Sequence, residues 1–132
     1  MSSISTRKKD HIDLTLSETS QYRRPTGFEK YQLKHNALPE CGLDDISFKS
    51  HLLGRDFDFP LFISSMTGGH GEATNLNADI ATFCEQFNIP FGVGSQRAML
   101  EDSTHEKSFT IVRDKAPNAF IAANIGGAQL IV

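Results

Sequence analysis

The sequence predicts an α/β fold in which helices cover a parallel sheet. The chain has 132 residues, 39% of them hydrophobic and 22% charged, a composition that suits one globular domain with a core. Short apolar runs at 61–63, 91–93 and 120–123 predict strands, and segments with helical periodicity at 72–87 and 104–115 separate them. Because parallel neighbours need a long crossover, usually a helix, this alternation favours a parallel sheet.

The N-terminal third carries weaker signals. Thr6 is a candidate N-cap for a short helix with a narrow apolar face. Residues 17–44 show no period of 2 or 3.6 and contain two prolines and two glycines, which predicts loops with a helical turn.

A hairpin and a first strand are expected next. Residues 46–53 alternate weakly and lead into the turn-like sequence GRD at 54–56, which predicts a β-hairpin. The strand that follows should cover 60–64 and begin at Pro60, because proline has no N–H to donate to a strand partner.

The segment 72–87 is the clearest helix of the sequence. Its apolar side chains recur mostly at spacings of three or four residues, at Ala73, Leu76, Ile80, Phe83, Cys84 and Phe87. Pro90 stops the helix, and FGVG at 91–94 is then a short buried strand. The second helix, 104–115, ends before Pro117 and leads into a third strand within AFIAANIGG.

Each predicted strand is followed by small and polar residues: SSMTGG at 64–69, GSQR at 94–97 and NIGG at 124–127. Two architectures fit, a doubly wound sheet and a (β/α)8 barrel, and both bind ligands beyond the carboxyl ends of their strands. Glycines let backbone N–H groups approach a ligand, and Ser, Thr, Asn and Arg supply hydrogen bonds and charge. One such cluster alone is more often a simple turn, but three together predict a cofactor site.

Ordinary structural roles remain open for individual residues. Arg97 precedes Glu101 by one helical turn, so a surface ion pair is the alternative to a ligand contact. Met66 belongs to a residue type more often found in cores, and Asn124 suits a turn cap. The histidines are scattered, which favours surface or turn positions over catalysis for His11, His35, His51, His70 and His105.

A cationic patch is predicted near the N-terminus. Arg7, Lys8 and His11 have the spacing of residues that share one helical face. Positive charge at a helix N-terminus opposes the helix dipole and does not stabilise the helix there. A role in anion binding is therefore slightly favoured over a merely solvated helix start.

Composition and spacing argue against several classes of protein. A net charge of -3, from 13 basic and 16 acidic residues, gives no general attraction to nucleic acid or an anionic membrane. No apolar run approaches the ~18 residues of a membrane span. The two cysteines lack CxxC spacing, which argues against a zinc site or a disulfide scaffold and for the reducing cytoplasm. GVGSQR is not a dinucleotide fingerprint, because Arg97 takes the place of the third glycine.

Four motifs follow one another along the chain: RKKDHI (7–12), PLFISSMTGG (60–69), FGVGSQRAMLED (91–102) and SFTIVRDKAPNAFIAANIGGAQL (108–130). Together they resemble the type 2, FMN-dependent isopentenyl-diphosphate isomerases. The resemblance implies an enzyme of isoprenoid biosynthesis that interconverts isopentenyl and dimethylallyl diphosphate, with reduced FMN as the acid–base group. It also implies Mg²⁺, NADPH as the flavin reductant, and a homo-oligomer when the protein is full length.

The resemblance further implies a fold and a set of residue roles. The fold is a (β/α)8 barrel, of which this chain carries an N-terminal extension, residues 1–45, and about three β/α units, residues 46–132. Flavin contacts are implied for Ser65, Met66, Thr67, Ser95 and Asn124. Diphosphate contacts are implied for Arg7, Lys8, His11, Ser95, Gln96 and Arg97, and no catalytic side chain or metal ligand is assigned before Val132.

The chain is short for that fold, because (β/α)8 barrels take about 250 residues and at least ~200 in compact cases. We therefore expect the N-terminal portion of the enzyme, inactive as a separate polypeptide. Two alternatives stay open. One is another FMN-dependent barrel oxidoreductase, against which the cationic patch speaks, and the other is a non-enzymatic half-barrel module that binds a partner or self-associates.

Overall fold

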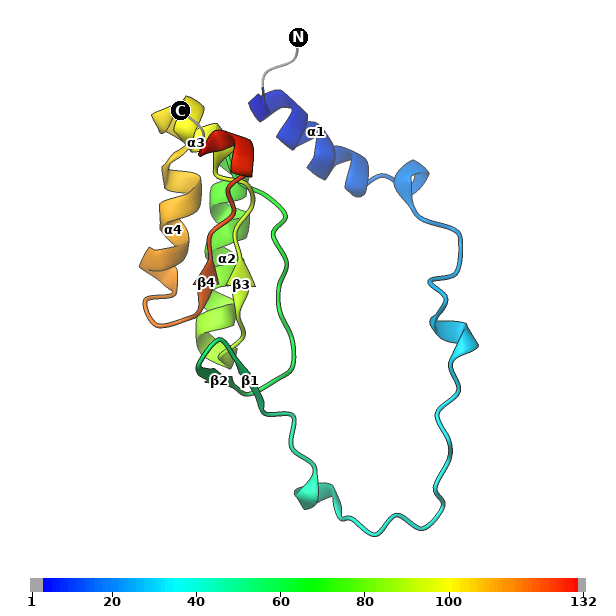
Figure 1. Cartoon of the computed structure of the whole chain (residues 1–132). Coiled ribbons are helices and arrows are strands. Elements are labelled where there is room, and N and C mark those ends of the chain that lie inside the picture. The colour runs from blue at the N-terminus through cyan, green and yellow to red at the C-terminus, as the bar shows by residue number, and fades with distance from the viewer. Residues whose placement is uncertain (1–3, 131–132) are drawn as a thin grey trace.

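The computed structural model describes residues 4–130. The chain starts with helix α1 (Ile4–Thr15), continues through a wide arc, and ends in an α/β body (Figure 1). The arc agrees with the predicted loops, and its short 3-10 turns lie at Glu18–Ser20, Phe28–Lys30 and Leu43–Asp45. Because α1 begins at Ile4, the prediction that Thr6 caps it is wrong. A lone threonine marks a helix start only to within one or two positions.

The predicted hairpin is confirmed. Strands β1 (Ser50–Leu52) and β2 (Arg55–Phe57) pair in the antiparallel sense. The two residues between them have positive φ, 50° at Leu53 and 77° at Gly54. Positive φ at both central positions is the type I′ geometry, whose twist matches that of the flanking strands.

A parallel sheet is also confirmed. Strand β3 (Phe91–Gly92) pairs in parallel with β4 (Ile121–Ala122). On its other side β3 forms one parallel bridge to Ile63. The strands therefore follow one another across the sheet in chain order, with β3 in the centre.

The strand predicted for 60–64 is wrong in extent, because this stretch forms only the single bridge at Ile63. Ile63 donates its N–H to the carbonyl of Pro90 at 3.0 Å and accepts from Gly92 at 2.8 Å. Pro60 has no N–H, and within residues 4–130 no strand pairs with the other side of this stretch.

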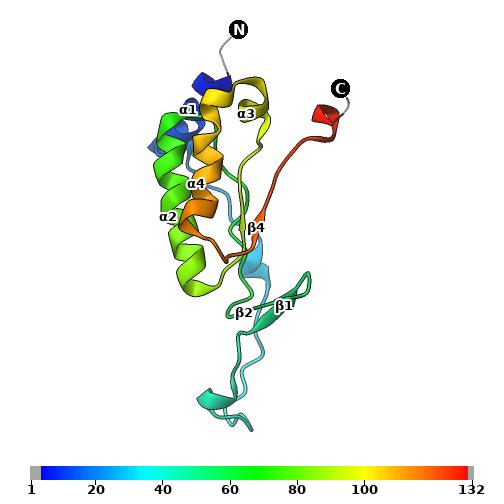
Figure 2. The same cartoon turned by 90° about the vertical axis from the view of Figure 1, so that its left-hand side faces the viewer.

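Helices cover one face of the parallel sheet. Helices α2 (Gly71–Phe87) and α4 (Lys107–Lys115) agree with the prediction, pack against each other and lie on the same side of β3 and β4 (Figure 2). A short helix, α3 (Arg97–Glu101), and a 3-10 turn at Ser103–His105 were not predicted. They fill the connection between β3 and α4.

The core lies between these helices and the sheet, and its buried members are Ala81, Cys84, Ile89, Phe91, Val93, Phe109, Val112, Ala116 and Ala119. The predicted apolar face of α2 is only partly correct. The helix buries Ala73, Asn77, Ala81 and Cys84, whereas Phe83 and Phe87 are 45% and 40% exposed. Small residues face the sheet and α4 because the helix packs closely there, and the two phenylalanine rings contact each other outside.

Three further sequence expectations can be compared with the structure. Both cysteines are free thiols, Cys41 exposed and Cys84 buried. For His70 a surface or a turn position was expected: it lies in the bend that leads into α2, but it is only 6% exposed, so a surface position is wrong. Within residues 4–130, no helix has the length and apolar character that crossing a membrane requires.

Candidate functional site

Backbone hydrogen bonds join the three strand-end segments at one edge of the sheet. The N–H of Gly94 donates to the carbonyl of Thr67 at 3.1 Å, and the N–H of Gln96 donates to the carbonyl of Asn124 at 2.8 Å. Motifs that lie far apart in the sequence are therefore neighbours in space. This is the carboxyl edge of a parallel sheet, the position at which α/β folds bind ligands.

Packing within the protein requires two of the glycines in these segments. A Cβ on Gly94 would lie 2.3 Å from the carbonyl oxygen of Thr67. Gly69 has a φ of 82°, which residues with side chains rarely adopt. Its N–H donates to the hydroxyl of Ser108 at 2.8 Å. Because the N–H groups of both glycines are bonded within the chain, the prediction that strand-end glycines present N–H donors to a ligand is wrong for these two.

A buried polar network, which the sequence reasoning missed, supports the first strand-end segment. Asn77 of α2 is 1% exposed and donates to the carbonyl of Ser108 at 2.7 Å and to that of Thr67 at 3.5 Å. The Nε2 of His70 lies 3.1 Å from the Oγ1 of Thr67. The network fixes this segment against α2 and α4. The signal that could have revealed it is a polar residue at a spacing of four within the small-residue face of a helix.

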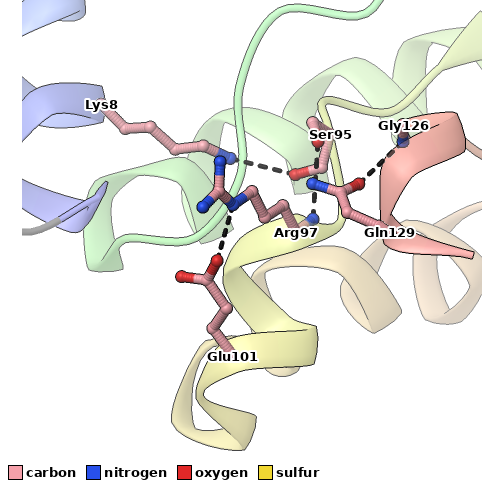
Figure 3. Close-up of polar contacts among 6 residues, drawn as sticks. All are labelled: Lys8, Ser95, Arg97, Glu101, Gly126 and Gln129. Atoms are coloured by element: carbon pink, nitrogen blue, oxygen red, sulfur yellow. Dashed lines mark hydrogen bonds and ion pairs between the residues drawn. The ribbon is translucent and has the colours of Figure 1, made fainter. Parts of the chain in front are cut away.

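Helix α1 contacts the strand ends through Lys8. Its Nζ donates to the carbonyl of Ser95 at 3.1 Å (Figure 3). The same nitrogen lies 5.5 Å from the ring centroid of Phe109. Burial and, to a smaller degree, the charge of Arg7 lower the pKa of Lys8. An anion bound beside Nζ would act in the opposite direction, because opposite charge favours the protonated amine.

A pocket of about 360 Å³ lies between α1 and the first strand-end segment. It is lined by Lys8, His11, Ile12, Thr15, Leu16, Met66, Thr67 and Leu76. Met66 is 65% exposed, so the alternative that places it in the core is wrong. Ligand sites usually measure ~300–1,000 Å³ and combine apolar walls with a few polar groups. The volume of this pocket and its mixture of apolar and polar side chains agree with those properties.

Arg97 begins α3 and is paired within its own helix. Its Nε lies 2.6 Å from the Oε1 of Glu101, and both side chains are about half exposed (Figure 3). The surface ion pair considered as an alternative therefore exists. Since exposed pairs contribute little to stability, the guanidinium can exchange the carboxylate for another anion at small cost.

The predicted site residues Ser65, Gln96, Asn124 and Arg7 do not line this pocket. The hydroxyl of Ser65 packs over β3, where a Cβ on Gly92 would lie 2.8 Å from it. Gln96 and Asn124 meet through their backbones. Arg7 is exposed and does not line the pocket. The structure thus brings Lys8 and His11 together with Met66 and Thr67 around the pocket. Ser95 joins them only through its carbonyl, which accepts from Lys8.

A parallel sheet with an apolar pocket at its carboxyl edge defines an α/β protein of the kind that binds a cofactor at its strand ends. The sequence profile of the family described as FMN-dependent dehydrogenase matches residues 5–118, and the chain belongs to that family. The family consists of (β/α)8 barrel enzymes, and its description names FMN as the cofactor.

Similar curated proteins carry one name, isopentenyl-diphosphate delta-isomerase, which confirms the resemblance seen in the motifs. The protein of Chlorobium luteolum is 47% identical over 129 residues, covering 97% of this chain and 36% of the relative. That of Archaeoglobus fulgidus is 46% identical over 98% of this chain and 37% of its own length. That of Methanococcoides burtonii is 43% identical with 97% and 36% coverage. The chain therefore spans about a third of the length of these relatives.

The pocket fits FMN better than it fits a metal. Exposed Met66 and the neighbouring apolar walls suit a flat ring, and Thr67 lines the same wall while its hydroxyl contacts His70. In contrast, residues 4–130 contain no group of three or more His, Cys, Asp or Glu side chains placed to hold a metal ion. No metal-dependent step can be derived from the described part of the chain.

Proposed function

We propose that this chain forms one wall of the active site of an FMN-dependent isomerase that interconverts isopentenyl and dimethylallyl diphosphate in isoprenoid biosynthesis. The observation that supports this best is the pocket at the strand ends, where α1 contributes a cationic edge and Met66 and Thr67 line the opposite wall. The names of the relatives agree with it. In this proposal residues 1–45 are an extension and residues 46–132 are the first three β/α units of a (β/α)8 barrel.

The flavin side of the site consists of the strand-end side chains. Met66 and Thr67 line the pocket, and Ser65 precedes them on the same segment. Ser95 and Asn124 follow the next two strands and complete the set of proposed flavin contacts. When bound, reduced FMN supplies the acid–base group for proton transfer at carbon. These five residues hold and orient it.

The diphosphate side consists of α1 and the start of α3. Lys8 and His11 line the pocket, and Arg7 raises the local positive charge. Ser95, Gln96 and Arg97 lie on the segment that Lys8 contacts. A diphosphate needs several cationic and N–H donors, which this set provides. Helix α1 lies beside the strand ends, where Lys8 contacts Ser95, so in this proposal it shields one side of the substrate from water.

Further properties of the enzyme are proposed from the resemblance. They are Mg²⁺ bound together with the substrate, NADPH as the reductant of the flavin, a cytoplasmic location and a homo-oligomeric assembly. None of the roles given to this chain's own side chains depends on them.

A chimera tests the proposal. The aligned segment of the Chlorobium luteolum relative is replaced by this chain, and the purified product is supplied with FMN, NADPH, Mg²⁺ and isopentenyl diphosphate. We expect dimethylallyl diphosphate to form. A folded chimera that binds FMN but forms no dimethylallyl diphosphate would contradict the isomerase assignment. This chain alone, assayed in parallel, should show no turnover.

The description of the matched family favours one alternative, an FMN-dependent oxidoreductase. Such an enzyme consumes one reductant or oxidant in each turnover, whereas isomerisation consumes none. The ratio of NADPH oxidised to product formed in the chimera separates the two. A ratio far below one supports the isomerase, and a ratio near one supports the oxidoreductase.

A further inference from the structure

His70 is buried at the start of α2, yet its side chain does not cap the helix. The residue is 6% exposed, and its backbone is extended at φ −156° and ψ 163°. A buried polar group costs free energy unless it is hydrogen bonded. The partner of the imidazole therefore indicates its role.

That partner is the hydroxyl of Thr67, whose Oγ1 lies 3.1 Å from Nε2 of His70. The backbone of Thr67 is held separately, because its carbonyl accepts from Gly94 at 3.1 Å and from Asn77 at 3.5 Å. Backbone and side chain are thus fixed by different partners. Removing the imidazole would free the hydroxyl while leaving the backbone contacts in place.

Burial is the main reason that the imidazole of His70 is neutral near pH 7. Burial lowers the pKa of His70, and Glu72 at the start of α2 opposes this. Lys8 and Lys9 of α1 and His105, in the 3-10 turn before α4, act in the same direction as burial. A neutral imidazole presents either a donor or an acceptor at Nε2. If Nε2 accepts, the threonine hydroxyl offers two lone pairs to a ligand; if Nε2 donates, it offers its O–H and one lone pair.

We propose that His70 is a positioning residue for the flavin: through Nε2 it directs the hydroxyl of Thr67 toward the ligand in the pocket. The inference rests on the proposed function, because the contact between Thr67 and FMN is part of that proposal. His70 itself does not line the pocket and acts only through Thr67.

The test compares His70→Gln with His70→Asn. Glutamine carries its amide at about the distance of Nε2 from the backbone, whereas asparagine falls short of Thr67. FMN is titrated into the purified chimera, with each substitution made in the segment that this chain supplies. Quenching of flavin fluorescence gives the Kd for FMN. We expect His70→Asn to weaken binding roughly three- to tenfold, the effect of one hydrogen bond, and His70→Gln to restore it to within about twofold.

A double-mutant cycle with Thr67→Val separates positioning from general stability. Once the hydroxyl is absent, His70→Asn should have no further effect on Kd. An undiminished effect in the Thr67→Val background would overturn the inference, as would equal Kd values for His70→Gln and His70→Asn. If the chimera without these substitutions binds no FMN, the proposed function fails together with this inference. If it binds FMN but the cycle shows no coupling, only the inference fails.

Discussion

The Nζ of Lys8 lies 3.1 Å from the carbonyl oxygen of Ser95, although 87 positions separate the two residues in the sequence. The contact joins the N-terminal helix to the segment that follows the central strand of the sheet. It places a half-buried cation at the edge of the pocket, where the proposed diphosphate would bind.

Replacing Lys8 should loosen α1 without unfolding the body. Lys8→Met removes the hydrogen bond to Ser95 and the contact with Phe109, so the free energy of opening α1 should fall by roughly 1 kcal/mol. Hydrogen exchange of the α1 amides measures this opening. Lys9→Met is the matched control, because Lys9 hydrogen bonds to Asp13 on the same helix and faces Glu72 of α2 only through a charge interaction. Equal exchange rates in both variants would show that Lys8 does not hold α1.

Gly94→Ala should destabilise the body. The new Cβ would lie 2.3 Å from a backbone oxygen of Thr67, which cannot rotate away. Forcing the two segments apart should cost ~3 kcal/mol or more, as read from urea unfolding. Gly127→Ala serves as the control, because a Cβ there meets nothing within 4 Å. A Gly94→Ala variant as stable as the control would contradict the close packing of these strand ends.

Asn77→Ala should be more harmful than its position on a helix suggests. It removes the side-chain hydrogen bonds to the carbonyls of Ser108 and Thr67 in the core, which should cost about 1–2 kcal/mol in urea unfolding. Asn75→Ala, on the exposed side of the same helix, should change stability by less than ~0.5 kcal/mol. Similar losses in both variants would mean that the buried network contributes nothing specific.

Arg97 and Glu101 should affect anion binding in opposite directions. Arg97→Ala removes a guanidinium and should weaken pyrophosphate binding to the chimera roughly tenfold, whereas Glu101→Gln removes its competitor and should strengthen binding two- to threefold. Calorimetric titration measures both. Because the pair is half exposed, neither change should alter stability by more than ~0.5 kcal/mol. Arg23→Ala, in the arc, should leave binding unchanged.

The two cysteines should react at very different rates. Burial raises the pKa of Cys84 from 9.0 to about 11, so at pH 8 iodoacetamide should label exposed Cys41 and spare Cys84 until the protein unfolds. Since the folded thiol has the higher pKa, its contribution to stability is complete below pH 9 and is lost as pH rises toward about 11. Mass spectrometry of the labelled peptides measures the extent of alkylation at each cysteine. Equal labelling at pH 8 would contradict the burial of Cys84.

The elements that could be predicted are those defined by local sequence. Helical periodicity identified α2 and α4, and the prolines that follow them marked where they end. The turn-like sequence around Gly54 identified the hairpin, because a type I′ turn needs positive φ. Motif order also indicated that three polar segments would meet at one edge of a parallel sheet.

The parts that could not be predicted depend on contacts between distant segments. Whether residues 60–64 form a strand depends on pairing with segments distant in the sequence, and within residues 4–130 Ile63 alone of this stretch forms a bridge. The buried face of α2 is selected by close packing against α4, so small Ala81 faces inward and large Phe83 outward. The hydrogen bond between Lys8 and Ser95 could not be predicted either, because the two residues are 87 positions apart and no sequence pattern relates them.

The arc between α1 and β1, residues 16–49, is a long loop that links α1 to the α/β body. The entropy of closing a flexible loop grows only with the logarithm of its length, by ~0.6 kcal/mol for each doubling. Adding or removing a few arc residues should therefore change the docking of α1 far less than losing Lys8 would. The arc can accept a peptide tag or a fluorophore while the helix keeps its place over the strand ends.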